Sequence, residues 1–418
     1  MAAKNPKRAK PSPKPASLPT PTVPESPSRR QLLPVVGVGA SAGGLEAFTD
    51  FLKHLPRDSG MAFVLIQHLD PKQHSQLTEL LAKTTRMSVV EVTADSTLKP
   101  DTVYVIAPGT LLRLSDGRLR IEPRGTSRDL PIDRFLRSLA LENGSNAIGV
   151  VLSGTASDGT LGLKTIKSEG GVTFVQEPST AKFDGMPRSA IAAGVADFVL
   201  PPAEIARRVA RLKNHLHSGH AESREDDADQ EAEVQLNRLF HLLRTVTGND
   251  FSHYKAPTIR RRIHRRMVLH AVQKLGDYVA FLHDNPAEVR AMADDLLISV
   301  TSFFRDEKAF EILSTKVFPR LLDKRSADDP IRVWVAGCAT GEEAYSIAIC
   351  LAEFLEQHTA NIPVQLFATD VSESAIEKAR VGIYGLPSLA EVSPARLEIA
   401  NFCPRLRHRS ASARRILT

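Results

Sequence analysis

The chain has 418 residues, 42% of them hydrophobic and 6% aromatic, and its formal net charge is +6 at pH 7. A chain of this length is expected to form two or three domains, each with a sizeable hydrophobic core. The sequence has no apolar run long enough to cross a membrane and no pattern of base-stacking aromatic residues, so neither membrane insertion nor nucleic-acid binding is expected. The three cysteines (Cys338, Cys350 and Cys403) have neither disulfide-framework nor metal-site spacing, which favours a reducing cytoplasm and predicts no metal site.

The first 31 residues differ from the rest of the chain in composition. Lys, Arg, Pro and Ser dominate this segment, and it lacks the apolar core of a signal peptide. We therefore expect residues 1–31 to be a disordered basic tail.

The next segment predicts a strand, a tight turn and a helix. Valines within 35–38 predict a buried strand, small residues fill positions 39–44, and helical spacing of apolar residues begins at Leu45. Ser41 lies in the turn, beyond the end of the strand and close to the amides that begin the helix.

Two motifs fit this turn, and an ordinary tight turn is a third interpretation. Residues 39–43 match G-x-S-x-G, which places a nucleophile on a strand-to-helix turn. Residues 37–42 match the relaxed dinucleotide pattern G-x-G-x-x-A. The dinucleotide interpretation expects an acidic ribose ligand at the end of the next strand. That strand ends instead in His68, which suits a general base, and Asp70 comes two residues later.

From residue 32 to residue 212, apolar runs alternate with helical stretches. This alternation predicts an α/β domain with a doubly wound, mainly parallel sheet. Asp116 and Gly117 lie between alternating runs and predict a hairpin at a sheet edge. The expected strands are 35–38, 62–67, 88–92, 103–106, 147–152, 172–176 and 198–200, and the expected helices are 45–55, 75–84, 132–141, 161–168 and 203–216.

Three polar residues follow strands of this sheet: Ser41, His68 and Asp158. The carboxyl ends of parallel strands share one edge, where ligands bind, so the three could form a catalytic triad. In a triad the histidine takes the proton of the serine hydroxyl and the carboxylate orients the histidine. Singly, each residue is better explained as a helix cap, a structural histidine or a turn residue. Together, the three strand-end positions favour the triad.

Five motifs occur in order in this region: Gly-Ala-Ser-Ala-Gly-Gly at 39–44, Gln-His-Leu-Asp at 67–70, Tyr-Val-Ile-Ala-Pro-Gly at 104–109, Leu-Ser-Gly-Thr-Ala-Ser-Asp-Gly at 152–159 and Phe-Asp-Gly-Met-Pro-Arg at 183–188. They resemble the CheB-type chemoreceptor methylesterase domain. The resemblance implies hydrolysis of glutamate methyl esters, and deamidation of glutamines, on receptor helices. It implies Ser41 as nucleophile, His68 as base and Asp158 as orienting carboxylate, with the amides of Ala42 and Thr155 near the oxyanion. No receiver domain, usual in this family, is expected before residue 32.

The middle of the chain predicts a linker and then a helical domain. Residues 213–233 are polar and acidic, which is typical of a linker; their histidines have no closed metal-site pattern. From 234 to 322, helical spacing of apolar residues returns. A basic helix is expected to start near Thr258, with Ile259, Ile263 and Met267 on its buried face.

Five arginines are expected on the remaining faces of this basic helix: Arg260, Arg261, Arg262, Arg265 and Arg266. Such a run usually forms a solvated charged face. The functional alternative is a docking surface for an acidic peptide or helical protein.

Residues 329–400 repeat the plan of strand, glycine turn and helix. The turn at 337–341 has no phosphate-loop lysine, and the following strand ends in Asp370, where a carboxylate can accept hydrogen bonds from ribose hydroxyls. This arrangement suits a nucleoside ligand, although the glycines alone fit an ordinary α/β turn.

Five motifs in this half resemble the CheR-type receptor glutamate methyltransferase: Thr-Ile-Arg-Arg-Arg-Ile at 258–263, Val-Thr-Ser-Phe-Phe-Arg at 300–305, Gly-Cys-Ala-Thr-Gly-Glu-Glu at 337–343, Ala-Thr-Asp at 368–370 and Glu-Lys-Ala-Arg-Val-Gly-Ile-Tyr at 377–384. The resemblance implies that S-adenosyl-L-methionine is bound by Thr301, Arg305, Glu343 and Asp370, and that the basic helix meets the receptor.

A methyltransferase sheet of this class needs further strands after Asp370. Residues 401–418 are rich in Arg and Ser and have no strand pattern. We therefore expect a partial cofactor domain, ended by truncation or a shifted reading frame, with defective methyl transfer.

The combined interpretation is a cytoplasmic CheB–CheR type fusion that acts in chemotactic adaptation. Its expected partners are chemoreceptor-like helical proteins with methylatable glutamates, and its esterase half needs no cofactor. Two alternatives stay open. One is a scaffold that only binds receptor helices, and the other is a Rossmann-type oxidoreductase that binds nicotinamide at residues 37–42.

Overall fold

The structure is a computed structural model, and it describes residues 33–68, 76–124, 130–216, 226–297, 301–323, 329–360, 362–384, 386–389 and 392–397. The expected tail at 1–31 and the expected aberrant end at 401–418 lie outside these residues.

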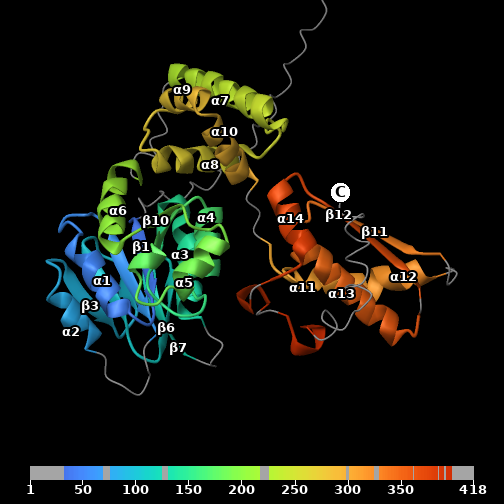
Figure 1. Ribbon diagram of the computed structural model, residues 1–418, viewed down its shortest axis with the longest axis horizontal. Helices are drawn as coiled ribbons and strands as arrows, with labels where there is room; N and C mark the ends of the chain where they lie inside the picture. Colours follow the sequence, from blue (N-terminus) through green and yellow to red (C-terminus); the bar gives the residue numbers. More distant parts are fainter. Residues whose placement is uncertain are drawn as a thin grey trace, which may run out of the picture. The chain divides into compact units, whose positions relative to one another are not determined.

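A seven-stranded parallel sheet forms the centre of the first domain (Figure 1), as the sequence predicts. Its strand order is β10-β9-β8-β1-β2-β5-β3. The chain first adds strands on one side of β1 and then, from β8 onward, on the other side, so the strand order reverses at β1. In such sheets, ligands bind at the carboxyl ends of the strands at this reversal. The strands are β1 (Val35–Ala40), β2 (Ala62–Gln67), β3 (Ser88–Val92), β5 (Thr102–Ile106), β8 (Ala147–Val151), β9 (Val172–Gln176) and β10 (Phe198–Leu200).

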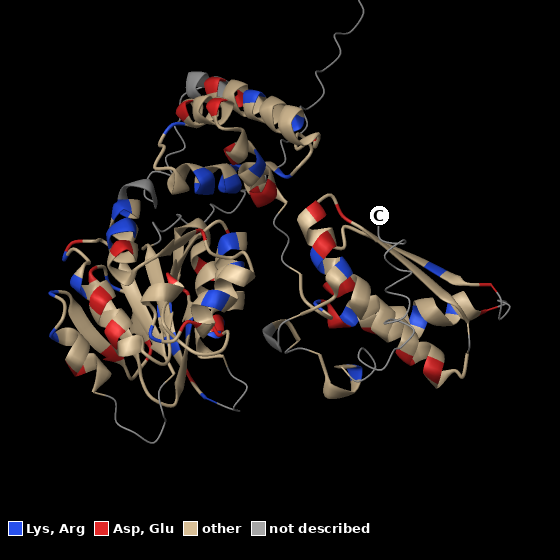
Figure 2. Cartoon of the chain, viewed as in Figure 1, with Lys and Arg blue, Asp and Glu red and all other residues tan. Residues whose placement is uncertain are grey.

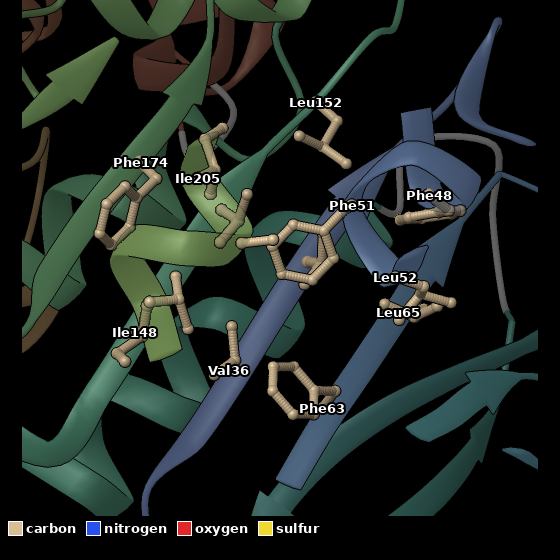
Figure 3. Packing of buried hydrophobic residues seen from close by; sticks show 14 of the residues in the cluster. Val36, Phe48, Phe51, Leu52, Phe63, Leu65, Ile148, Leu152, Phe174 and Ile205 are labelled. Atoms are coloured by element: carbon tan, nitrogen blue, oxygen red, sulfur yellow. The ribbon is translucent and has the colours of Figure 1, made fainter. Parts of the chain in front are cut away.

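Helices cover both faces of this sheet. One face packs against α1 (Gly44–Lys53) and α6 (Pro202–Leu216), and Figure 3 shows Phe51 and Ile205 meeting over β1 and β8. The other face packs against α3 (Pro131–Asn143), α4 (Thr160–Ser168) and α5 (Gly185–Ala192). The sequence predicts all of these helices except α5, which is short and begins with Gly-Met-Pro, so it lacks a clear helical period. The small helix α2 (Leu77–Ala82) is shorter than expected.

Two glycines of β1 allow α3 to pack closely on the sheet. A Cβ atom added at Gly39 would lie 2.3 Å from Ile132 Cγ2, and one added at Gly37 would lie 2.6 Å from Leu136 Cδ2. Both distances are too short for a real contact, so a larger residue at either position would displace these side chains. The glycines of the dinucleotide-like pattern therefore have a packing role, which weakens the oxidoreductase interpretation.

The expected hairpin is present, but its expected place at an edge of the main sheet is wrong. β6 (Thr110–Ser115) and β7 (Arg118–Pro123) join through Asp116 and Gly117, whose φ angles of 55° and 69° suit a tight hairpin turn. With β4 (Ser96–Thr97) they form a separate antiparallel sheet. The hairpin packs on α3 instead, where the Leu114 amide donates to Ser138 Oγ at 2.9 Å.

The helical domain contains α7 (Asp226–Thr247), α8 (Ala256–Leu269), α9 (Leu275–Asp284) and α10 (Pro286–Leu296) around one core. α7 begins inside the segment that was expected to be a linker. The basic helix is α8, and its predicted buried residues Ile259, Ile263 and Met267 are indeed buried.

The five arginines of α8 do not form one solvated face. Figure 2 shows Lys and Arg along this helix, yet Arg262 and Arg265 are buried, with Arg265 0% exposed. Arg262 donates to the carbonyls of Lys167 and Ser168 at the end of α4, at 2.5 and 2.6 Å. Burial is possible because each guanidinium group finds fixed acceptors in the first domain.

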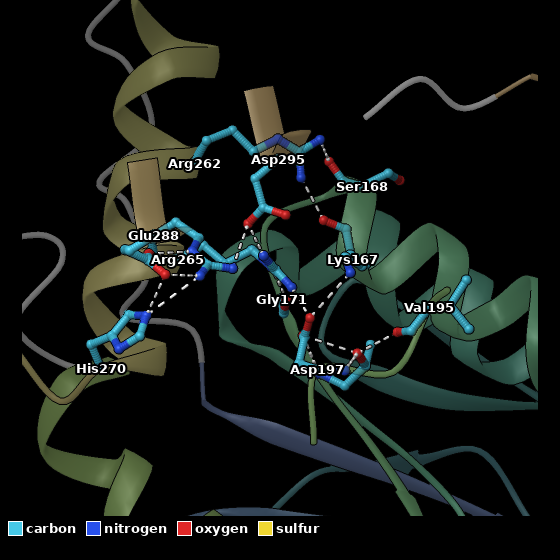
Figure 4. A network of polar contacts seen from close by, with 12 residues as sticks. Lys167, Ser168, Gly171, Val195, Asp197, Arg262, Arg265, His270, Glu288 and Asp295 are labelled. Carbon is cyan, nitrogen blue, oxygen red and sulfur yellow. Dashed lines mark hydrogen bonds and ion pairs between the residues drawn. The ribbon is translucent and has the colours of Figure 1, made fainter. Parts of the chain in front are cut away.

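Arg265 is held by three acceptors (Figure 4). It donates to the Gly171 carbonyl at 3.0 Å and forms ion pairs with Asp197 and Asp295. Gly171 and Asp197 precede β9 and β10, at the amino ends of these strands. The contacts of α8 therefore lie at the edge of the sheet opposite the carboxyl ends.

The last part of the chain contains α11 (Glu307–Ile312), a π-helical turn at Leu313–Val317, α12 (Phe318–Leu322), β11 (Ile331–Ala336), α13 (Glu342–Gln357), β12 (Val364–Thr369) and α14 (Glu373–Val381). β11 and β12 pair in parallel. No helix of the described residues is both long and apolar enough to span a bilayer.

Candidate active site

Ser41 follows β1 in a turn that the backbone holds firmly. Its amide donates to the Ser153 carbonyl at 2.9 Å, and its own carbonyl accepts from the Gly44 amide at 2.9 Å. Gly43 has a φ of 73°, and a Cβ there would lie 2.7 Å from Ser153 Oγ, so the turn requires glycine. The Ser41 hydroxyl is thereby fixed beyond the carboxyl end of β1.

The structure brings the three strand-end side chains together. Ser41 Oγ lies 3.1 Å from His68 Nδ1, and His68 Nε2 lies 2.8 Å from Asp158 Oδ2. A carboxylate only accepts, so Nε2 carries the proton and the lone pair of Nδ1 faces the serine hydroxyl. This arrangement can remove a proton from Ser41 and return it to a leaving group.

Asp158 is 1% exposed, and the start of α3 holds its carboxylate. Oδ2 accepts from the Ile132 amide at 3.1 Å, and Oδ1 accepts from the Asp133 amide at 2.8 Å. Unpaired amides and the helix dipole favour an anion at this position. Sequence analysis missed these contacts, because nothing in the local pattern of α3 indicates a partner 25 residues away.

The loop after β8 approaches Ser41 closely. Ser153 Oγ donates to the Ala42 carbonyl at 2.9 Å and accepts from the Phe183 amide at 3.0 Å. A Cβ at Gly154 would lie 3.0 Å from Ser41 Cβ and 2.1 Å from Met186 Sδ, so this position also requires glycine. Neither the Ala42 amide nor the Thr155 amide donates to an acceptor within the described residues, so both can donate to an oxyanion.

A cleft of about 510 Å³ begins at this loop. Phe183 stands 41% exposed in its wall, and Lys182 pairs with Glu46 at 3.0 Å. The cleft is lined by Thr155, Ala156, Ala181, Lys182, Phe183, Asp184 and Gly185. The sequence singled out Phe-Asp-Gly-Met-Pro-Arg only as a family motif, and the structure places half of it in the wall of this cleft.

In the last part of the chain, the four predicted cofactor residues come from three segments. Asp370 follows β12, and its carboxylate accepts from the Ala339 and Ser372 amides at 2.8 Å each. Glu343 is exposed in the first turn of α13. Thr301 and Arg305 belong to the same short segment as Phe304. The Phe304 amide donates to Ser346 Oγ of α13 at 3.0 Å. All three segments thus meet near the first turns of α13.

Comparisons with known families cover most of the described chain. Residues 36–209 match the CheB methylesterase family, 235–297 match the all-alpha domain of CheR methyltransferases, and 299–411 match their SAM-binding domain. The chain joins a CheB methylesterase domain to the all-alpha and SAM-binding domains of the CheR family. The match to the SAM-binding domain extends to residue 411, and defective methyl transfer stays a prediction.

Individual relatives match over part of their length. An "Uncharacterized 104.1 kDa protein in hypE 3'region" of Rhodobacter capsulatus is 37% identical over 342 residues, which are 77% of this chain and 36% of that protein. A "Protein-glutamate methylesterase/protein-glutamine glutaminase 3" of Geobacter metallireducens is 39% identical over 185 residues, 43% of this chain and 52% of that protein. The chain therefore spans about a third to a half of the length of these two relatives.

The crystal structure of the Thermotoga maritima CheB methylesterase catalytic domain is also similar. It shares 27% identity, covers 43% of this chain and 98% of its own, and has a TM-score of 0.41.

The CheR half has the residue types that S-adenosyl-L-methionine needs. The turn between β11 and α13 has positive φ at Gly337 (72°), Ala339 (48°) and Gly341 (99°), so the chain turns tightly at the end of β11. Carboxylates at Glu343 and Asp370 suit the amino and ribose hydroxyl groups of this cofactor. The residues present thus fit the cofactor that the family match implies.

Proposed function

We propose that the CheB domain hydrolyses glutamate methyl esters on chemoreceptor-like helical proteins and deamidates glutamines there, as part of chemotactic adaptation in the cytoplasm. The observation that carries this proposal is the hydrogen-bonded chain from Ser41 Oγ through His68 to Asp158, at 3.1 and 2.8 Å. The catalytic roles of these three residues are part of the proposal.

The reaction is acyl transfer. Ser41 Oγ attacks the carbonyl carbon of the side-chain ester while His68 Nδ1 takes the hydroxyl proton. The amides of Ala42 and Thr155 donate to the oxygen that becomes negative. His68 then protonates the leaving methoxide as methanol, and water attacks the acyl-enzyme in the same way to release glutamate and Ser41. For a glutamine substrate, ammonia leaves in place of methanol.

The surroundings of Ser41 suit a side chain presented by a helix. The cleft is open, its wall carries the exposed ring of Phe183, and its rim carries the ion pair of Lys182 with Glu46. A methyl ester of glutamate is uncharged and long enough to reach past such a rim.

The experiment is methanol release from methylated receptor fragments by the full chain. Ser41→Ala should lower the rate by about a thousandfold or more, because the nucleophile is lost. Ser115→Ala, in the separate hairpin, is the matched control and should keep the wild-type rate. Hydrolysis that persists undiminished in Ser41→Ala would refute the assignment.

For the CheR half, we propose that Thr301, Arg305, Glu343 and Asp370 bind S-adenosyl-L-methionine. This cofactor, when bound, supplies an electrophilic methyl group for a receptor glutamate. The chain's own residues orient it: Asp370 already organises the glycine turn through the Ala339 amide, and its remaining lone pairs can accept from ribose hydroxyls.

Calorimetry with the cofactor alone tests this second proposal. Asp370→Ala should weaken binding at least tenfold, because it removes ribose acceptors and loosens the turn. Glu373→Ala, an exposed residue in the first turn of α14, should leave the affinity within about twofold. Equal affinities for wild type and Asp370→Ala, or no binding by the wild type, would contradict the proposal.

A further inference from the structure

A second buried carboxylate lies directly behind Asp158. Asp133 belongs to the first turn of α3 and is 4% exposed. Its Oδ1 accepts from the Gly162 amide, in the first turn of α4, at 2.7 Å. Its Oδ2 is buried and has no hydrogen-bond partner among the described residues. The esterase mechanism above makes no use of this side chain.

Asp133 and Asp158 cap each other's helices. Asp158 lies just before α4 and accepts from the Ile132 and Asp133 amides that begin α3. Asp133 lies at the start of α3 and accepts from the Gly162 amide that begins α4. Each carboxylate therefore satisfies amides that the other's helix leaves unpaired. The position of Asp158 is tied to both helices at once.

α3 and α4 are in close contact beside Asp133, so neither helix can shift without moving the other. A Cβ at Gly162 would lie 2.5 Å from Leu136 Cβ and 3.3 Å from Asp133 Cα. A close-packed contact of this kind transmits a displacement of one helix to the other. Loss of the Asp133 cap would thus displace the Asp158 carboxylate. It would also displace the His68 ring, which is bonded to Asp158 at 2.8 Å.

The ionisation state of Asp133 affects its interaction with the Asp158 carboxylate. Burial, and then the neighbouring Asp158 carboxylate, raise the pKa of Asp133 to about 7, while the Gly162 and Gly159 amides and the Arg137 guanidinium act in the opposite direction. Below this pH the side chain is a neutral acid, and its Oδ1 still accepts from the Gly162 amide. Above it, two buried negative charges would face each other behind His68.

We propose that Asp133 is a positioning residue of the esterase, whose carboxyl group caps α4 and so holds the Asp158 carboxylate at hydrogen-bond distance from His68. This inference rests on the proposed function of the CheB domain. Asp133 does not touch the substrate and acts only through Asp158. When Asp133 ionises, repulsion between the carboxylates works against the alignment, and activity falls.

Two variants and one control test this role through methanol release. Asp133→Ala removes the cap and should lower kcat by about tenfold to a hundredfold with little change in KM, because alignment and not binding is lost. Asp133→Asn keeps an oxygen that can accept from Gly162 but cannot ionise, so it should recover most of the lost rate. Asn143→Ala is the control, since Asn143 is also buried on α3 but bonds to the Leu33 carbonyl at its far end.

The pH dependence separates positioning from plain stability. The ratio of Asp133→Asn activity to wild-type activity should rise at least threefold between pH 6 and pH 9, because only the wild type acquires the second charge. A purely structural cap predicts a constant ratio. Because this measurement uses only Asp133→Asn and the wild type, it still tests the proposal if Asp133→Ala fails to fold.

Three results would overturn the inference: wild-type kcat in Asp133→Ala, an equal loss in Asn143→Ala at an equal fall in melting temperature, or a constant ratio across pH. Failure of the proposed function is a different outcome, in which the wild type releases no more methanol than Ser41→Ala.

Discussion

At the scale of single residues, His68 determines what Ser41 can do. Its ring presents Nδ1 to the serine and Nε2 to Asp158, at 3.1 and 2.8 Å. Asp158 is an acceptor toward His68 and toward two backbone amides. The carboxylate therefore selects the tautomer that leaves a lone pair facing the hydroxyl.

Asp158→Asn should lower kcat for methanol release by about 10⁴-fold. The asparagine NH₂ group would donate to Nε2, which forces the proton onto Nδ1 and removes the base from Ser41. The amide oxygen, in the place of Oδ1, can still accept from the Asp133 amide, but the Ile132 amide loses its acceptor. The melting temperature should therefore fall by several degrees while the protein still folds. Kinetics and thermal unfolding measured on one preparation check both parts. A folded Asp158→Asn enzyme with near wild-type kcat would show that tautomer selection is unimportant.

At the scale of elements, the fit of α3 on β1 connects the core to the site. Gly37 and Gly39 leave room for Leu136 and Ile132. The start of the same helix presents the amides of Ile132 and Asp133 to Asp158. Packing on one face of the sheet thus sets the position of a carboxylate at its edge.

Gly39→Ala should lower the free energy of unfolding by about 1–3 kcal/mol, because the new methyl group would lie 2.3 Å from Ile132 Cγ2 and must displace α3. Denaturant unfolding measures this loss. Gly276→Ala in α9 is the control: its nearest neighbour is 3.8 Å from the added Cβ, so it should be neutral or slightly stabilising. Equal stability of Gly39→Ala and wild type would contradict the prediction, because it would mean that α3 can shift without any loss in the free energy of unfolding.

At the scale of the whole molecule, some of the arginines of α8 bind acceptors elsewhere in the same chain. Arg265 is fully buried between Asp197 and Asp295, and Arg262 donates to the end of α4. These two arginines are not available to an acidic partner in this arrangement. Any receptor contact of this helix would have to use exposed side chains such as Arg260.

Arg265→Ala should lower the free energy of unfolding by about 3 kcal/mol, since two buried carboxylates would lose their nearest counter-charge. Among the described residues, Asp197 would keep only Lys167, at 3.4 Å, and Asp295 would keep only Arg266, at 3.7 Å. Arg260→Ala, exposed on the same helix, should stay within about 0.5 kcal/mol of the wild type. Denaturant unfolding of both variants gives the comparison. A small, equal effect in the two would mean that the buried ion pairs contribute little.

The same ion pairs predict an acid dependence. Burial alone would raise the pKa of Asp197, but Arg265 and Lys167 outweigh it and hold the pKa below its usual value. A carboxyl group with a lowered folded-state pKa stabilises the fold above its unfolded-state pKa, and this stability is lost as the pH falls through the folded-state pKa. The difference in stability between wild type and Arg265→Ala should therefore shrink in acid, below about pH 4.

The sequence by itself determined the parallel sheet and the convergence of Ser41, His68 and Asp158. Apolar runs of strand length specify buried strands, and parallel strands bring their carboxyl ends to one edge whatever the details of packing. The buried face of α8 at Ile259, Ile263 and Met267 followed from the same local periodicity.

Only the tertiary structure decided the features that depend on distant partners. The exchange of caps between Asp133 and Asp158, the burial of Arg262 and Arg265, and the packing of the hairpin on α3 all join residues far apart in the chain. A charged side chain is buried only where fixed groups of opposite polarity meet it, and periodicity along a single helix carries no information about those groups.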